Sequence, residues 1–243
     1  FFIESIVEGL AEQGYLGPVE PGSQRMELKR GLQDLLLPDS IQDVVLSRID
    51  LLSETEKLVV KVASVIGRIF TLDAVAALVP TLGHTVLREA MDTLQRLGLI
   101  LLETEEPYTC LFKHIVIRDV AYNTLLVSAR EDLHRRLARY LEARASDNLA
   151  GSAGLLAFHF LAGNVEDKGL EYTLMAARSA RAQYANDDAL YHYNRGLELL
   201  GTVVPVDPEV TLLQTRRVMQ ELAETLLQAG HYANAILMFE QCL

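Results

Sequence analysis

A long stretch without proline, between Pro107 and Pro205, is the feature that most constrains how this chain can fold. A proline inside a helix costs about 3 kcal/mol, so its absence leaves room for successive helices. At 243 residues the chain makes one large domain or two to three small ones and can bury a core without metal or disulfides. We expect a mainly α fold, with helices near 114–127, 131–146, 152–162, 168–184, 187–200, 209–229 and 232–243.

Caps and prolines divide the chain before Pro107 into shorter elements. Ser53-Glu54-Thr55-Glu56 is a capping-box pattern, in which the serine hydroxyl accepts a backbone N–H and Glu56 reaches back. The helix that begins there should stop at Gly67. The remaining predicted elements are helices over 1–14, 38–50, 71–80 and 84–97, with short extended pieces within 15–37.

A β-hairpin should follow these helices. The extended runs 99–103 and 108–113 are joined by Glu105-Glu106-Pro107, which favours a turn. Helices followed by a hairpin form the order of a winged-helix domain, here 51–127. We expect Val86, Leu87 and the apolar residues that follow at helical spacing to form the buried face of its third helix.

Small and aromatic residues recur with a common spacing near the end of the chain. Ala177 lies twelve residues before Ala189, and Ala223 lies twelve before Ala235. Small residues let paired helices approach closely, and an aromatic residue fills the space between them. The other residues that we assign to this packing are Tyr193, Gly196, Gly230, Tyr232 and Phe239.

This pattern resembles tetratricopeptide repeats, an α-solenoid of helical hairpins. The two copies are 46 residues apart, and the segment around Pro205 and Pro208 supplies the excess over a 34-residue period. The first copy is degenerate, because Tyr184 stands where the repeat prefers glycine. A generic helical hairpin is the alternative.

Composition excludes several classes of protein. The net charge of −11 and the pI near 5.0 disfavour binding to nucleic acids or anionic membranes, which need a positive surface. The two cysteines, Cys110 and Cys242, are too few for a disulfide framework and fit a reducing, cytoplasmic location. No apolar run is long enough to span a bilayer, so we expect no membrane association.

Motifs of common active sites are absent from the sequence. It contains no Gly-x-x-x-x-Gly-Lys-[Ser/Thr], no His-Glu-x-x-His and no Gly-x-Ser-x-Gly. The six histidines show no metal-ligand spacing. We therefore predict no catalytic residue and no metal site, and this segment is not expected to be an enzyme.

The predicted winged helix lacks a basic reading surface. In its third helix, Arg88 and Arg96 are balanced by Glu89 and Asp92. The tip of the hairpin, Glu103-Thr104-Glu105-Glu106, would repel phosphates. We expect a structural or regulatory domain rather than a partner for nucleic acid.

Several motifs together resemble one known arrangement. Leu37-Pro38-Asp39-Ser40 with Arg48-Ile49-Asp50 is similar to "Leu-Pro-x-Ser/Thr … Arg-Ile-Asp", and Ala63–Phe70 to "Ala-Ala-Val-Ile-Gly-Arg-x-Phe". Three further stretches match the same family: Phe1–Ile6, Phe112–Tyr122 and Ala157–Asn164. The family is that of STAND-type signalling ATPases, in the variety attached to bacterial adenylate/guanylate cyclases, Ser/Thr kinases and LuxR-type regulators.

The resemblance implies a domain order and a missing partner. It assigns a lid remnant to 1–50, a winged helix to 51–127, a helical connector to 128–164 and incomplete repeats to 165–243. The ATPase core would precede Phe1 in the same protein, so ATP or ADP would bind the full-length protein and this segment alone would bind no cofactor. The lack of an initiator Met at Phe1 and the end at Leu243 within a repeat favour an internal piece of a longer chain.

The resemblance also gives one residue a role. His114 stands between the second hairpin strand and the next helix, where NOD-like receptors carry the His that contacts the β-phosphate of ADP. A His at a helix N-terminus can donate to an anion. This sequence reads Phe-Lys-His-Ile and lacks the trailing Asp of the Met-His-Asp motif, so a core His bonded to a carbonyl is the alternative. Lys113 and Arg118 would face a nucleotide or water.

The leading hypothesis is a regulatory and interaction module of a signalling ATPase, whose repeats present a surface to a protein, peptide or small ligand. The segment 165–243 holds eleven acidic and six basic residues, which favours a basic partner. A stand-alone winged-helix and repeat adaptor, or a fragment of a transcription regulator, is the alternative. The sequence does not identify the output domain of the parent protein, for which a cyclase, a kinase and a transcription factor are all alternatives.

Overall fold

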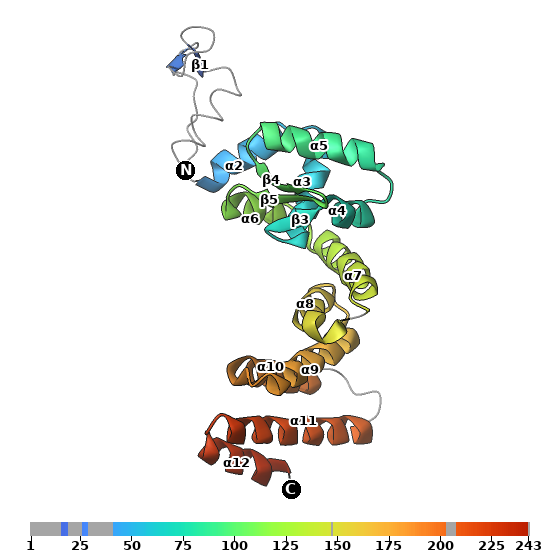
Figure 1. Cartoon of the computed structure of the whole chain (residues 1–243), viewed down its shortest axis with the longest axis vertical. Helices are drawn as coiled ribbons and strands as arrows, with labels where there is room; N and C mark the ends of the chain where they lie inside the picture. The colour runs from blue at the N-terminus through green and yellow to red at the C-terminus, as the bar shows by residue number, and fades with distance from the viewer. Residues whose placement is uncertain (1–15, 19–25, 29–40, 147, 203–207, 243) are drawn as a thin grey trace. The chain divides into compact units, whose positions relative to one another are not determined.

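The computed structural model describes residues 16–18, 26–28, 41–146, 148–202 and 208–242. They fall into two compact units divided between Val127 and Ser128, and each unit is described by itself. The described part is mainly helical, with small antiparallel sheets (Figure 1). The predicted helix over 1–14 lies outside the described residues. Strands β1 (Leu16–Pro18) and β2 (Met26–Leu28) pair antiparallel, within the segment where short extended pieces were expected.

The first unit alternates helices and short strands. After β1 and β2, its elements are α2 (Ile41–Asp50), α3 (Glu54–Ile66), β3 (Ile69–Thr71), α4 (Leu72–Leu78), α5 (His84–Arg96), β4 (Ile100–Glu105), β5 (Tyr108–Phe112) and α6 (Ile115–Asn123). The capping box is confirmed, because the Glu56 N–H donates to the Ser53 hydroxyl and the Ser53 N–H donates to the Glu56 carboxylate. The Thr71 hydroxyl caps α4 in the same way.

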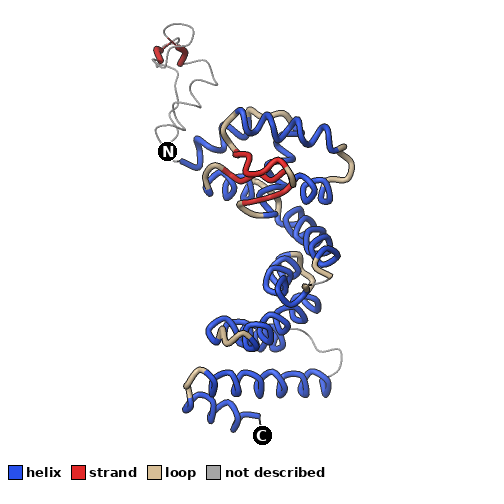
Figure 2. Tube along the Cα trace, in the orientation of Figure 1, coloured by secondary structure: helices blue, strands red, loops and turns tan. Residues whose placement is uncertain are grey.

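A three-stranded antiparallel sheet lies among these helices, with strand order β3-β5-β4 (Figure 2). The predicted hairpin of β4 and β5 is confirmed, whereas β3 was not among the expected elements. The aromatic rings of Phe70 on β3 and Phe112 on β5 lie 5.3 Å apart and are almost fully buried. The central strand β5 thus connects the sheet to the core that α3, α4 and α5 complete.

Arg48 joins α2 to the turn that follows α5. Arg48 is 4% exposed, and its Nη2 donates to the Leu97 carbonyl over 2.5 Å. Gly98 follows with φ +67°, a conformation that glycine adopts at helix ends without strain. The prediction that Val86 belongs to the buried face of α5 is wrong, since Val86 is 43% exposed and the buried stripe is Leu87, Ala90, Met91 and Leu94.

Helices make up the described part of the second unit. They are α7 (Val127–Arg144), α8 (Leu149–Ala162), α9 (Glu166–Ala182), α10 (Asn186–Thr202), α11 (Pro208–Gln228) and α12 (Tyr232–Cys242). From α8 onward each helix packs against the next one in the chain. No helix among the described residues combines the length and the apolar character that crossing a bilayer requires.

The small residues of the two sequence copies lie where these helices meet. The residues with no exposed surface are Ala177, Ala189, Tyr193, Ala223 and Ala235. Ala177, Ala189, Tyr193 and Ala235 belong to one apolar cluster that extends from α9 to α12. Gly196 is also buried, and a Cβ at this position would lie 2.6 Å from Leu174 Cδ2, so α10 approaches α9 closely there.

The turns of the two helical hairpins need left-handed backbone. Gly230, between α11 and α12, has φ +82°, which glycine adopts at little cost. Tyr184, between α9 and α10, has φ +58° and adopts the same left-handed conformation. This conformation costs a tyrosine conformational free energy that a glycine would not lose.

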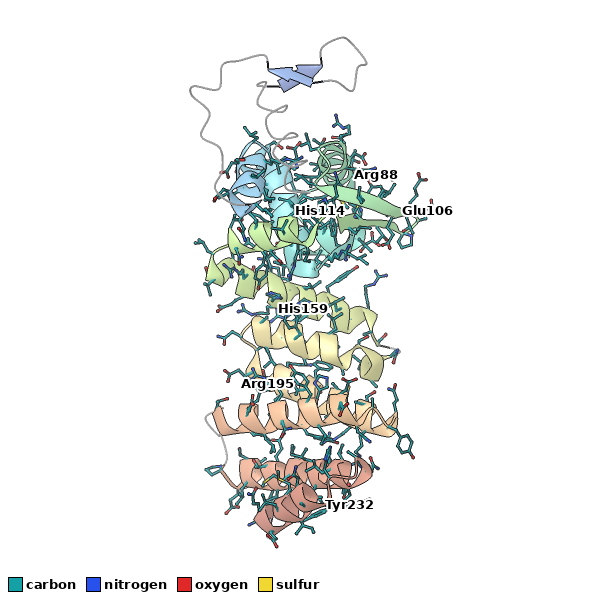
Figure 3. The ribbon with its side chains drawn as sticks, turned by 90° about the vertical axis from the view of Figure 1, so that its left-hand side faces the viewer. Arg88, Glu106, His114, His159, Arg195 and Tyr232 are labelled. Atoms are coloured by element: carbon teal, nitrogen blue, oxygen red, sulfur yellow. The ribbon has the colours of Figure 1, made fainter. Side chains whose placement is uncertain are left out.

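Two predicted packing residues lie outside the core. Tyr232 is 66% exposed at the start of α12 and does not fill a space between helices, contrary to the prediction (Figure 3). Phe239 is only partly buried on the same helix. The aromatic part of the pattern is therefore realised at Tyr193 and not at Tyr232.

Replacing Ala189 by Leu should lower the free energy of unfolding by about 1–3 kcal/mol, because the larger side chain overpacks the contact of α9 with α10. The control is Ala233→Leu at an exposed position of α12, which should change it by less than about 0.5 kcal/mol. Urea unfolding followed by circular dichroism measures both. Equal effects of the two variants would contradict the packing.

Candidate functional site

His114 occupies the position between β5 and α6 that the sequence predicted. It is the N-cap residue of α6, with extended backbone (φ −136°, ψ 142°), and its side chain makes no capping bond to the helix. Two backbone hydrogen bonds fix the chain just before His114. The Phe112 N–H donates to the Arg68 carbonyl, and the Lys113 N–H donates to the Leu99 carbonyl. The position of His114 is therefore fixed by both neighbours of β5.

A shallow, open hollow of about 480 Å³ lies beside His114. Its other lining residues are Ile41 and Gln42 from α2 and Ile115 and Val116 from α6. The first turn of a helix carries N–H groups and the positive end of its dipole, so an anion is favoured at such a place. The hollow thus combines an imidazole, an amide and a helix N-terminus on one surface of the first unit.

The Arg118 side chain makes its contacts within the first unit. Its Nε donates to the Ser64 carbonyl of α3 over 3.0 Å, and its Nη1 pairs with Asp119 at 3.0 Å. Its guanidinium also lies over the ring of Tyr122, 5.3 Å from the centroid. These contacts hold α6 against α3, and neither Arg118 nor Lys113 lines the hollow beside His114.

The exposed face of α5 and the β4–β5 hairpin form an acidic surface. The guanidinium of Arg88 lies 4.7 Å from the centroid of the Tyr108 ring, and the Tyr108 hydroxyl donates to Asp92 over 2.5 Å. Burial, followed by this bond to Asp92, raises the pKa of Tyr108 well above its ordinary value. Glu105 is exposed near the tip of the hairpin and Glu106 at the tip itself (Figure 3).

A buried histidine pair in the second unit escaped the sequence analysis. The Nδ1 atoms of His134 on α7 and His159 on α8 lie 2.8 Å apart, and each residue is 1% exposed. One imidazole donates and the other accepts, so the tautomers of the two rings are coupled. The Phe158 ring packs against both imidazoles in a T-shaped arrangement. The pair joins α7 to α8, and twenty-five residues of separation hide it from any local motif.

A second cluster joins α7 to α9. The Glu142 carboxylate accepts from Lys168 Nζ at 2.6 Å and from the Tyr172 hydroxyl at 2.5 Å. Burial raises the pKa of Glu142, but the bonds from Lys168 and Tyr172 outweigh it and leave the pKa below its ordinary value. The Tyr172 ring stacks on Phe160, with centroids 5.5 Å apart and planes 5° apart.

Metal-binding side chains do not gather in the described residues. No three His, Cys, Asp or Glu side chains of this part of the chain lie close enough together to hold an ion. The two cysteines, Cys110 on β5 and Cys242 on α12, are both thiols. Burial raises the pKa of Cys110 to about 11, so its thiol stays protonated at neutral pH.

Comparison with known proteins gives one uncharacterised relative. It is a protein of Rhizobium meliloti (strain 1021) that is 26% identical over 207 residues. The match covers 85% of this chain but 19% of the relative, so the chain spans about a fifth of that protein's length. No family model and no solved structure matches the chain.

Replacing Tyr172 by Phe should cost about 1.5 kcal/mol of unfolding free energy at pH 7, because it removes a hydrogen bond to an ionised carboxylate and keeps the ring. Since the folded pKa of Glu142 is lowered, this contribution is complete above the ordinary value of 4.5 and is lost as the pH falls through the folded value.

Chemical denaturation of the wild type and of Tyr172→Phe between pH 3 and pH 7 measures this contribution of the Tyr172–Glu142 hydrogen bond and its loss at low pH. Tyr191→Phe is the matched control, because Tyr191 is 67% exposed, and it should change the free energy of unfolding by less than about 0.5 kcal/mol. A Tyr172→Phe penalty that grows on acidification would contradict the assignment.

Proposed function

We propose that this chain is the regulatory and interaction portion of a longer signal-transduction ATPase of the STAND type. Residues 51–127 would be its winged helix, since α3, β3, α4, α5, β4 and β5 follow one another in that order, and residues 1–50 would be the lid remnant. Residues 165–243 would be its repeat region, since α9 to α12 pack as hairpins on small residues, and residues 128–164 would be the helical connector before it. The likeness of the motifs to that family supports both assignments.

The observation that carries the proposal is the placement of His114. It lies at the head of α6, beside an open hollow, at the position where the resemblance expects the nucleotide sensor. Its imidazole would donate to a phosphate of ADP held by an upstream core, and the N-terminus of α6 would favour the same anion. Release of that contact on nucleotide exchange would then free the winged helix from the core.

The relative from Rhizobium meliloti is compatible with a longer parent, because the match covers 19% of its length. ATP or ADP binding, the cytoplasmic location and the attached output domain are parts of this proposal and belong to the whole protein. Two features support a domain that does not bind DNA: the hairpin is acidic, and the Arg88 guanidinium packs over the Tyr108 ring.

His114→Ala in the full-length parent should speed the release of ADP at least about 10-fold, since a hydrogen bond to a charged group contributes roughly 1.5–3 kcal/mol. The control is His84→Ala, at the exposed first residue of α5, which should leave the rate unchanged. Stopped-flow fluorescence of a labelled ADP measures the release. Equal rates in the wild type and in His114→Ala would refute the sensor role.

A further inference from the structure

A groove of about 460 Å³ lies between α9 and α11, within the second unit. Arginines from both helices line it, beside one carboxylate and the chain just after α9. The lining residues that matter here are Arg178, Arg181, Tyr184, Arg217, Glu221 and Gln228. Among these residues, the sequence analysis singled out Tyr184 as part of the repeat pattern and none of the charged side chains.

The ion pairs across the groove leave an excess of positive charge. Arg178 Nε lies 2.9 Å and Arg217 Nε 3.3 Å from the two carboxylate oxygens of Glu221, so two guanidiniums share one carboxylate. Arg181 Nη1 pairs with Glu224 at 2.9 Å. Three guanidiniums therefore face two carboxylates.

Glu221, the carboxylate shared by Arg178 and Arg217, lies at the floor of the groove. The Glu221 side chain is 15% exposed, against 46% for Arg178 and 74% for Arg217. Burial raises the pKa of Glu221, but Arg178, Tyr193 and Arg217 outweigh it and hold the pKa below its ordinary value. Each guanidinium has five N–H donors, and Arg178 and Arg217 pair with Glu221 through Nε, so their outer amino groups can bind a second acceptor. Arg181 uses Nη1 for Glu224 and for the Glu221 carbonyl, which leaves its other donors for such an acceptor.

The spacing of the arginines suits an extended chain. The pairs Arg178–Glu221 and Arg181–Glu224 both advance by three residues, so α9 and α11 run parallel along the groove. Positions three apart on a helix lie about 5–6 Å from each other, and alternate side chains of an extended peptide about 6.6 Å. The exposed Tyr184 and Gln228, where both helices end, offer a ring and an amide to such a chain.

We propose that this groove binds an acidic segment of a partner protein, whose carboxylates bind Arg178, Arg217 and Arg181. The assignment deepens the proposed interaction role of the second unit and rests on it. The expectation of a basic partner came from the summed charge of 165–243, and the local balance in the groove is the opposite. An open groove of this size would leave a small anion mostly hydrated, which favours a peptide.

The test uses the 243-residue chain and a fluorescein-labelled peptide with Glu at alternate positions among Gly and Ser. Fluorescence anisotropy should show binding at least about 10-fold tighter than that of the same peptide with Gln, and the affinity should fall as NaCl rises. Equal affinity for the Glu and Gln peptides would overturn the proposal. So would preference for a Lys peptide, or binding of inorganic phosphate without binding of the Glu peptide.

Variants with opposite expected signs separate this role from a structural one. Arg217→Gln should weaken the Glu peptide roughly 10-fold, whereas Glu221→Gln and the more exposed Glu224→Gln should each tighten it, because they free guanidiniums. Arg195→Gln is the matched control: Arg195 is 46% exposed and pairs with Glu198 on α10, outside the groove, so the affinity should not change.

Thermal unfolding shows whether each variant is folded before its affinity is compared. Weakening by Glu221→Gln and Glu224→Gln alike, or equal loss in Arg217→Gln and Arg195→Gln, would contradict the proposal. No nucleotide and no ATPase core enters the measurement, so its failure would leave the STAND assignment untouched, and the failure of that assignment would not alter the peptide affinity.

Discussion

Close approach of helices at small side chains is the constraint on which the second unit depends. Ala177, Ala189, Ala223 and Ala235 have no exposed surface, and a Cβ at Gly196 would lie 2.6 Å from Leu174 Cδ2. Because larger residues at these points would separate the helices, the spacing of the grooves between them follows from the same positions. The arginine groove between α9 and α11 exists because α10 sits close to both helices.

The first unit depends in a similar way on its central strand. β5 pairs with both β3 and β4 and carries Phe112 into the core against Phe70. The chain leaves this strand directly into α6, so the backbone of His114 is fixed by the sheet on one side and by the helix on the other. A polar residue at such a junction is well placed to report a change in what lies against it, which is the physical basis of the proposed sensor role.

Local chemistry made much of the fold predictable from the sequence. Ser53 and Gly67 mark the two ends of α3, because the serine hydroxyl and the glycine N–H take part in hydrogen bonds that complete the helix ends, and both features are confirmed. Strand β3 escaped because its residues, Ile69–Thr71, are too few to show an alternating pattern. Tyr232 shows the limit of spacing alone, since its position in a repeat pattern does not bury it.

The candidate sites were less predictable, because they depend on residues brought together across helices. His114 was found from its place in a motif, yet the hollow beside it includes Ile41 and Gln42 from α2, far earlier in the chain. The groove pairs Arg178 with Glu221, forty-three residues apart, and a summed charge over the segment conceals it. Net charge predicts what a whole surface attracts, whereas the ligand of a groove is determined by the few charged side chains that line it.

The coding sequence that precedes Phe1 tests the central claim most directly. The account predicts a strand followed by Gly-x-x-x-x-Gly-Lys-[Ser/Thr], the loop that cradles nucleotide phosphates in an ATPase core. A natural start codon directly before Phe1, with no such loop, would contradict it and leave a stand-alone adaptor.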